Sequence, residues 1–147
     1  MKLKIAWIGK TKSTAIRTLT DDYLGRISHY TKVESQELHS EAALLKQFEP
    51  SAGRTKPFVI FLDSRGRELT SEHFAAFLRQ HQERGTQLLF FAIGPADGFS
   101  SAARDSASET LSLGRITLPH ELARVVLLEQ LYRAFTILAG HPYHSGH

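Results

Sequence analysis

Two uninterrupted apolar runs constrain the fold of this chain more than any other feature. They cover residues 57–63 and 88–93. A strand with one face in water alternates apolar and polar residues, whereas a strand covered on both faces is apolar throughout. Both runs are therefore expected to be central strands of a largely parallel sheet with helices on both faces.

The other segments alternate between strand and helix patterns around these two runs. We expect strands at 2–8 and 31–38, and a last strand together with its exit loop at 111–118. The strand at 31–38 should lie at a sheet edge because its pattern is polar. Helices are expected at 13–30, 41–48, 70–85 and 100–110, and a last one runs from about Pro119 to the stop at Gly140 and Pro142. Thr117 is the expected N-cap of this last helix. The chain is thus expected to be one α/β domain spanning 1–147.

Composition narrows the function classes. The chain has 147 residues, a net charge of +3 and no cysteine, so disulfides and thiolate chemistry are excluded. No apolar run reaches the roughly 18–20 residues of a membrane span, and the opening residues have no signal-peptide pattern. We therefore expect a cytoplasmic protein. Its dispersed positive charge is compatible with a polyanionic partner but does not identify one.

Three loops should meet at one edge of the sheet. They cover 62–66, 94–98 and 113–118, and each follows an expected strand. Ligands of open α/β sheets bind outside the carboxyl ends of the strands. The loop at 94–98 has neither the GxGxxG fingerprint nor the lysine of a Walker A loop. From pattern alone it is either a ligand loop or a turn that needs glycine.

Three histidines, His141, His144 and His147, lie in a short tail after the last helix. No second group of histidines or carboxylates is placed near them by spacing, so a zinc site is disfavoured. A polar tail and a general acid or base are the remaining interpretations. No metal is expected, and the absence of a GxSxG motif argues against serine hydrolase chemistry.

The last helix is apolar around most of its circumference. Its apolar positions are Leu122, Val125, Val126, Leu128, Leu131, Phe135 and Leu138. Such a helix is either packed centrally or covered by another chain on its second face. We favour a homodimer.

Four segments together resemble the SPOUT-class RNA methyltransferases, in particular the RlmH type, over the whole chain. They are 61–63 with the glycine turn, 93–98, 118–125, and 129–135 with His141-Pro142-Tyr143-His144. The resemblance implies a C-terminal trefoil knot, a rarity among proteins, and a homodimer. It also implies S-adenosylmethionine as cofactor, in a pocket formed by Leu62, Gly94, Leu113, Gly114, Arg115, Ile116, Thr117 and Leu118.

The same resemblance implies methylation of N3 of a pseudouridine in large-subunit ribosomal RNA. The target N–H must lose its proton, and His144 and Tyr143 are the candidates to orient the base or to accept that proton. Arg133 would stabilise the anionic base or a phosphate, although it is also spaced to pair with Glu129 one helical turn away.

Two positions depart from the family pattern. Pro95 stands where relatives have glycine, which removes a backbone N–H donor, and Ser145 stands where they have lysine or arginine. Modest charge and small size predict recognition of an assembled ribosomal surface. The alternative function is a non-enzymatic RNA- or nucleotide-binding α/β module, which would not need the tail.

Overall fold

A computed structural model describes residues 1–49, 53–95 and 97–144. Its centre is a five-stranded sheet in the order β2-β1-β4-β3-β5, and every pairing is parallel. The strands are β1 (Lys2–Ile8), β2 (Lys32–Leu38), β3 (Phe58–Glu68), β4 (Leu88–Ile93) and β5 (Glu109–Ser112). The α/β class with a parallel sheet is confirmed, and the polar strand β2 does lie at the edge.

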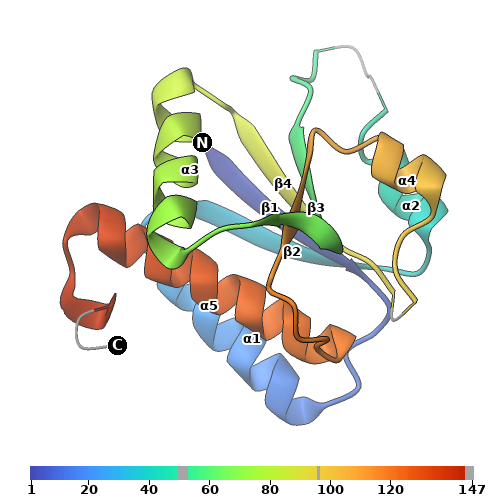
Figure 1. The fold of residues 1–147 in the computed structure, drawn as a ribbon, viewed down its shortest axis with the longest axis horizontal. Coiled ribbons are helices and arrows are strands. Elements are labelled where there is room, and N and C mark those ends of the chain that lie inside the picture. The colour runs from blue at the N-terminus through green and yellow to red at the C-terminus, as the bar shows by residue number, and fades with distance from the viewer. Residues whose placement is uncertain (50–52, 96, 145–147) are drawn as a thin grey trace.

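Helices cover both faces of this sheet, as Figure 1 shows. One face carries α1 (Thr14–Ile27), α3 (Ser71–Arg84) and α5 (His120–Ala139), and the other carries α2 (Glu41–Lys46) and α4 (Ser101–Asp105). Ser13, Ser40, Thr70 and Ser100 cap the first four helices through their side-chain oxygens. Short polar residues before each helix thus supply acceptors for the free N–H groups of its first turn.

Alternate residues of the central strands form two separate cores. Ile5, Ile60 and Phe91 point toward α1, α3 and α5 and are completely buried. Ala6, Phe61 and Phe90 point the other way, toward α2 and α4. Because successive side chains of a strand face opposite sides, a continuously apolar strand is what two covered faces require.

Strand β3 is longer than its apolar run predicts. The loop expected at 62–66 instead belongs to the second half of the strand, which pairs again with β5 after a register shift between Leu62 and Arg67. Gly66 permits this approach, because a Cβ there would lie 2.6 Å from the backbone of Leu111. The prediction failed because polar residues replace apolar ones where the strand leaves the core.

Two other boundaries differ from the predictions. Helix α4 ends at Asp105, and Glu109 and Thr110 belong to β5, which ends at Ser112. Thr117 does not cap α5: Pro119 occupies the N-cap position, and no side chain bonds there. Proline presets the extended backbone before the helix and has no N–H to satisfy, so the helix begins without a hydroxyl cap.

Helix α5 is packed between α1 and α3 on its face of the sheet, as both views show. Leu127, Leu128 and Leu131 are buried within the chain itself. The central position explains most of the apolar character of α5, while Leu122 remains 44% exposed. The trefoil knot stays a prediction. Among the described residues, no helix has the length and apolar character needed to cross a membrane.

Candidate functional site

A cavity of about 210 Å³ lies where β3 and β5 end against α3 and α5. Its apolar walls include Leu62, Leu69, Phe74 and Leu127, and Gln130 of α5 adds a polar group. Arg67, Glu68, Thr70, Leu111, Ser112, Leu113, Gly114 and Val126 complete the lining. The cavity therefore sits at the carboxyl edge of the sheet, where a ligand of an α/β fold is expected.

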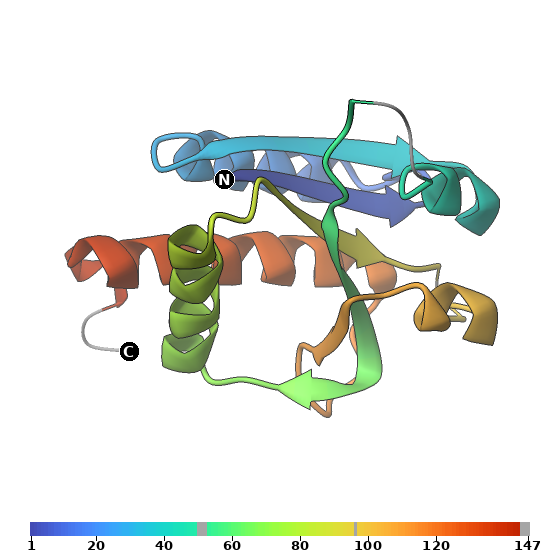
Figure 2. The same cartoon turned by 90° about the horizontal axis from the view of Figure 1, so that it is seen from above.

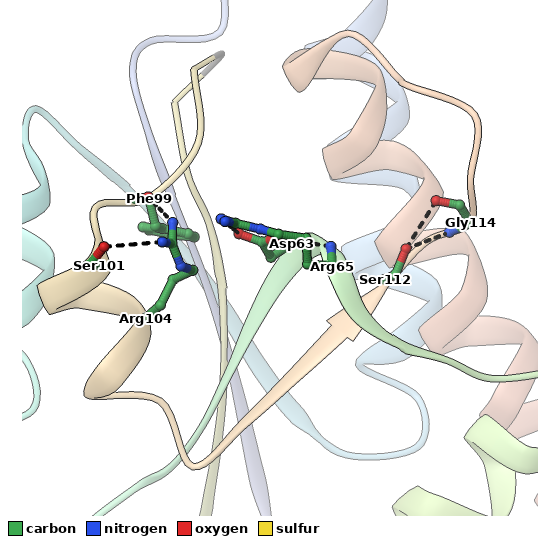
Figure 3. Close-up of polar contacts among 7 residues, drawn as sticks. All are labelled: Asp63, Arg65, Phe99, Ser101, Arg104, Ser112 and Gly114. Carbon is green, nitrogen blue, oxygen red and sulfur yellow. Dashed lines mark hydrogen bonds and ion pairs between the residues drawn. The ribbon is translucent and has the colours of Figure 1, made fainter.

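Three of the predicted cofactor residues, Leu62, Leu113 and Gly114, meet in this cavity. The Ser112 hydroxyl holds the turn at its rim: it donates to the Gly114 carbonyl at 2.9 Å and accepts from the Gly114 N–H at 3.1 Å (Figure 3). Gly114 has φ +126°, and no atom lies within 4 Å of where its Cβ would be. The turn thus needs glycine for its conformation and leaves open space beside it.

The next four predicted residues continue along the exposed approach to α5. Ile116 is 84% exposed, Thr117 is exposed and Leu118 is half-buried. Arg115 extends into solvent and pairs loosely with Glu68 at 3.5 Å. Within the described chain, no backbone hydrogen bond engages residues 115–117. Their N–H and C=O groups are therefore free for a ligand, and Ile116 offers an apolar surface to it.

Gly94 does not line the cavity. A Cβ at this position would lie 3.0 Å from the Phe99 ring, so the glycine serves close packing of its own loop. Pro95 accepts a hydrogen bond from the Gly98 N–H at 2.9 Å. The nearby Arg104 side chain donates to the Phe99 carbonyl at 2.6 Å, which fixes the far end of the same loop (Figure 3).

Between this loop and the cavity rim lies Asp63, as Figure 3 shows. Its carboxylate accepts three hydrogen bonds from Arg65, one from the backbone N–H and two from the guanidinium, at 2.9–3.1 Å. The Arg65 hydrogen bonds lower the pKa of Asp63 below its usual value. Asp63 therefore stays ionised near neutral pH and adds fixed negative charge to this edge.

The second group of predicted residues meets around one carboxylate on α5. Arg133 donates to Glu129 Oε2 through Nη2 at 2.8 Å and Nε at 3.1 Å. The Tyr143 hydroxyl donates to the same oxygen at 3.0 Å, and the guanidinium lies 5.1 Å from the centre of the Tyr143 ring. The pairing of Arg133 with Glu129 suggested by their spacing is thus observed, and Tyr143 joins it.

Burial raises the pKa of the Tyr143 hydroxyl well above its ordinary value of 10, and the neighbouring Tyr23 hydroxyl and Glu129 carboxylate raise it further. Tyr143 is therefore neutral at physiological pH and acts as a hydrogen-bond donor. A neutral phenol with so high a pKa does not accept the proton that the predicted target nucleobase must lose. The backbone of His144 belongs to the short 3-10 helix Pro142–His144.

An open hollow of about 350 Å³ lies between α1 and the tail. It is lined by Arg26, His29, Tyr30, Tyr132 and His141, and the Tyr30 hydroxyl pairs with Nδ1 of His141. No three histidine, aspartate or glutamate side chains gather for a metal in the described part of the chain. His147 and Ser145 lie outside the described residues.

The backbone segments that carry the two groups of predicted residues enter and leave α5 at its opposite ends, as Figures 1 and 2 show. The Tyr143 hydroxyl nevertheless reaches back to Glu129, the neighbour of the cavity residue Gln130. Sequence reasoning missed Gln130 and Ser71, which lie between the two groups. Gln130 interrupts the apolar positions of α5, which was the available signal, whereas Ser71 lies in a polar helix start and gave none.

Comparison with known proteins places this architecture in a family. The family model described as "Predicted SPOUT methyltransferase" matches residues 1–144. The protein named Ribosomal RNA large subunit methyltransferase H of Koribacter versatilis is 56% identical over 147 residues, and the match covers all of both chains. The protein of the same name from Geobacter sp. strain M21 is 43% identical, over 98% of this chain and 99% of its own.

Solved structures share the fold at low sequence identity. A structure described as "a probable methylase family protein" from Haemophilus influenzae has a TM-score of 0.57 and 9% identity, covering 98% of this chain and 70% of its own. The SpoU methyltransferase AviRb from Streptomyces viridochromogenes, in complex with AdoMet, has a TM-score of 0.56 and 14% identity, covering 95% and 59%. With a full-length family match and relatives above 40% identity, this chain belongs to the SPOUT methyltransferase family.

Proposed function

We propose that this protein transfers a methyl group from S-adenosylmethionine to large-subunit ribosomal RNA, at N3 of a pseudouridine on the assembled ribosome. One observation carries the proposal. A chain of the SPOUT family, matched from end to end by proteins named Ribosomal RNA large subunit methyltransferase H, has an apolar cavity at the carboxyl edge of its sheet.

The residues of this edge fit such a cofactor. The apolar walls formed by Leu62, Leu69 and Phe74 suit a flat ring, and the free backbone groups of 115–117 suit its polar edges and ribose. We assign Leu62, Leu113, Gly114, Arg115, Ile116, Thr117 and Leu118 to cofactor binding, and Gly94 to the packing that supports them. When bound, the sulfonium supplies the methyl group.

The tail supplies the chemistry of the acceptor base. Tyr143, held neutral with its single O–H donated to Glu129, orients the base through its ring or as a hydrogen-bond acceptor, which leaves His144 as the residue to accept the N3 proton, since imidazole titrates near neutral pH. Arg133 stabilises the negative charge that the base gains. Positioning two reactants in this way provides much of the acceleration of a direct displacement.

The assembly that we propose is a homodimer of single-domain chains, 1–147, acting on ribosomes in the cytoplasm. Ile116 and Leu122 leave apolar surface uncovered beside the cavity end of α5, as a contact between protomers requires. The hollow at Arg26, His29 and Tyr132 combines cationic and aromatic groups, which suit phosphates and unstacked bases of RNA. No metal takes part in this proposal.

The test is transfer of a labelled methyl group from S-adenosylmethionine to ribosomes that lack the modification, compared with naked ribosomal RNA. We expect label in the large-subunit RNA of ribosomes and at least tenfold less on naked RNA. Mapping by nuclease digestion and mass spectrometry then places the label on the base. Equal labelling of both substrates would refute recognition of the assembled ribosome.

A matched pair of variants tests the cofactor site. Ile116→Ala removes an exposed apolar side chain beside the cavity, and Leu19→Ala removes one that is 42% exposed from α1, away from the cavity lining. By calorimetry, the first should weaken S-adenosylmethionine binding about tenfold, roughly 1.4 kcal/mol for a lost apolar contact, and the second should not change it. A wild-type protein that releases no heat and shows no thermal shift with S-adenosylmethionine would instead favour the non-enzymatic binding module.

A further inference from the structure

A continuous chain of hydrogen bonds joins the cavity wall to the tail. The Ser71 hydroxyl donates to Gln130 Oε1 at 2.8 Å. The Gln130 amide donates through Nε2 to Glu129 Oε1 at 2.7 Å. The other carboxylate oxygen, Oε2, accepts from Arg133 and Tyr143. Every bond in this chain is between side chains, and it crosses from α3 through α5 to the tail.

Gln130 is the member of this chain that also lines the cavity. Its amide accepts on one side and donates on the other, so its orientation is fixed from both ends. Ser71 begins α3 directly after Leu69 and Thr70, which form part of the cavity wall. A ligand that contacts this wall can therefore shift the Gln130 side chain, and a shift of Gln130 changes its hydrogen bond to Glu129.

The two carboxylate oxygens of Glu129 bind different partners, one toward the cavity and one toward the tail. Oε1 faces Gln130, and Oε2 receives both the guanidinium and the phenol. Glu129 and Arg133 are about one-fifth exposed, and charge-assisted hydrogen bonds in such partly buried surroundings are stronger than those on an open surface. The carboxylate is therefore the anchor of the tail.

We infer that Glu129 is a positioning residue for Arg133 and Tyr143, and that Gln130 couples it to the cofactor cavity, so that an occupied cavity favours one placement of the tail. This inference rests on the proposed function, because it assigns the cavity to S-adenosylmethionine. Coupling requires that the ligand bind more tightly when Gln130 is hydrogen-bonded to Ser71 and Glu129 than when it is not. Coupling between sites in proteins typically spans 5- to 150-fold in affinity or population.

The coupling is tested by hydrogen exchange of the peptide that carries Tyr143, with and without S-adenosylmethionine. In the wild-type protein the cofactor should slow exchange of this peptide at least fivefold. Ser71→Ala breaks the first bond without altering the cavity lining, and Gln130→Leu breaks both bonds of Gln130, the one from Ser71 and the one to Glu129. Both should abolish the slowing and lower the single-turnover methylation rate on ribosomes about tenfold at saturating cofactor.

Glu34→Gln is the matched control, because Glu34 of β2 is also an ion-paired carboxylate but pairs with Lys2 and Lys4 of β1 and not with α5 or the tail. It should behave as the wild-type protein does. If Ser71→Ala and Gln130→Leu keep both the slowing and the rate within twofold of wild type, the coupling is wrong. If the wild-type protein binds no S-adenosylmethionine, the proposed function and the coupling fail together.

The hydrogen bonds that hold Arg133 and Tyr143 on Glu129, called here the Glu129 clamp, are tested separately, without cofactor or RNA, by ultraviolet titration of the tyrosines. The groups that face Tyr143 are Glu129, Tyr132 and Arg133 of α5 and Tyr23 of α1. Glu129→Gln removes the anionic acceptor, so the tyrosine assigned by Tyr143→Phe should ionise at lower pH than in the wild-type protein. An unchanged titration in Glu129→Gln would overturn the clamp even if methylation proceeds normally.

Discussion

Two arginines of α5 differ sharply in what surrounds them. Arg124 is 1% exposed and donates to neutral oxygens: the Thr11 hydroxyl at 2.9 Å and the carbonyls of Ile8 and Gly9 at 3.2 and 3.1 Å. Within the described chain, no carboxylate lies within ion-pair distance of it. Arg133 is partly exposed and shares a carboxylate with Tyr143.

Their pKa values shift in opposite directions. Burial lowers the pKa of Arg124, whereas the hydrogen bonds that Arg133 donates to Glu129 raise the pKa of Arg133. Burial of Arg124 costs desolvation energy, but its hydrogen bonds hold the loop after β1 against α5. Arg133 keeps its charge near solvent, where a substrate can compete for it. The comparison indicates that Arg124 serves the fold, whereas Arg133 is accessible for the role that we propose for it in the site.

The largest expected effect is on stability, at Arg124. Arg124→Ala leaves two buried carbonyls without a donor and opens space under the Trp7 ring, which the guanidinium faces at 5.1 Å. We expect a loss of about 3 kcal/mol in the free energy of unfolding, measured by urea denaturation. Arg124→Met, which restores apolar volume, should recover part of it. A loss below about 0.5 kcal/mol for the alanine variant would contradict the structural role.

At Arg133 the expected effect is on activity. Arg133→Ala should lower single-turnover methylation of ribosomes by 10- to 100-fold, as expected for a lost charge-assisted contact worth about 1.5–3 kcal/mol. Its free energy of unfolding should fall by less than about 1 kcal/mol, because the ion pair is partly solvated. If the rate falls only in proportion to a loss of folded protein, the contrast between the two arginines disappears.

The smallest expected effect is on how stability depends on pH, and it concerns Glu37, which bonds to the Arg124 partner Thr11. Glu37 accepts hydrogen bonds from the hydroxyl and the N–H of Thr11 at 2.7 and 3.1 Å, and the hydroxyl bond is the main cause that lowers its pKa below 4.5. A carboxyl with a lowered folded-state pKa adds stability above its unfolded value, and this stability is lost as the pH falls through the folded value.

Glu37→Gln should therefore destabilise the protein at pH 7 by less than about 1 kcal/mol, since the carboxylate is near solvent. The difference from wild type should vanish in acid, below both pKa values. Urea denaturation at pH 7 and at about pH 2.5 measures both states. An equal difference at the two pH values would show that the Glu37 charge does not contribute.

Much of the cavity, but little of the link to the tail, was accessible from the sequence. Leu62, Leu113 and Gly114 were expected together because parallel strands end at one edge, and the structure brings them together. Gly94 was placed in the same pocket by resemblance, and in the structure it packs against the Phe99 ring and is not among the residues that line the cavity. Sequence spacing also allowed the Glu129–Arg133 pair. It did not indicate Ser71, which lies 59 positions from Gln130.

The sequence by itself determined which strands are covered on both faces, because a continuous apolar run has no other stable place in a soluble fold. It also determined the start of α3 near Thr70 and the stop of α5 at Gly140, since these depend on neighbouring residues. Only the tertiary structure decided the strand order, the second half of β3 and the partners of Arg124 and Glu129. These depend on contacts between distant segments, and such contacts leave no local periodicity in a chain.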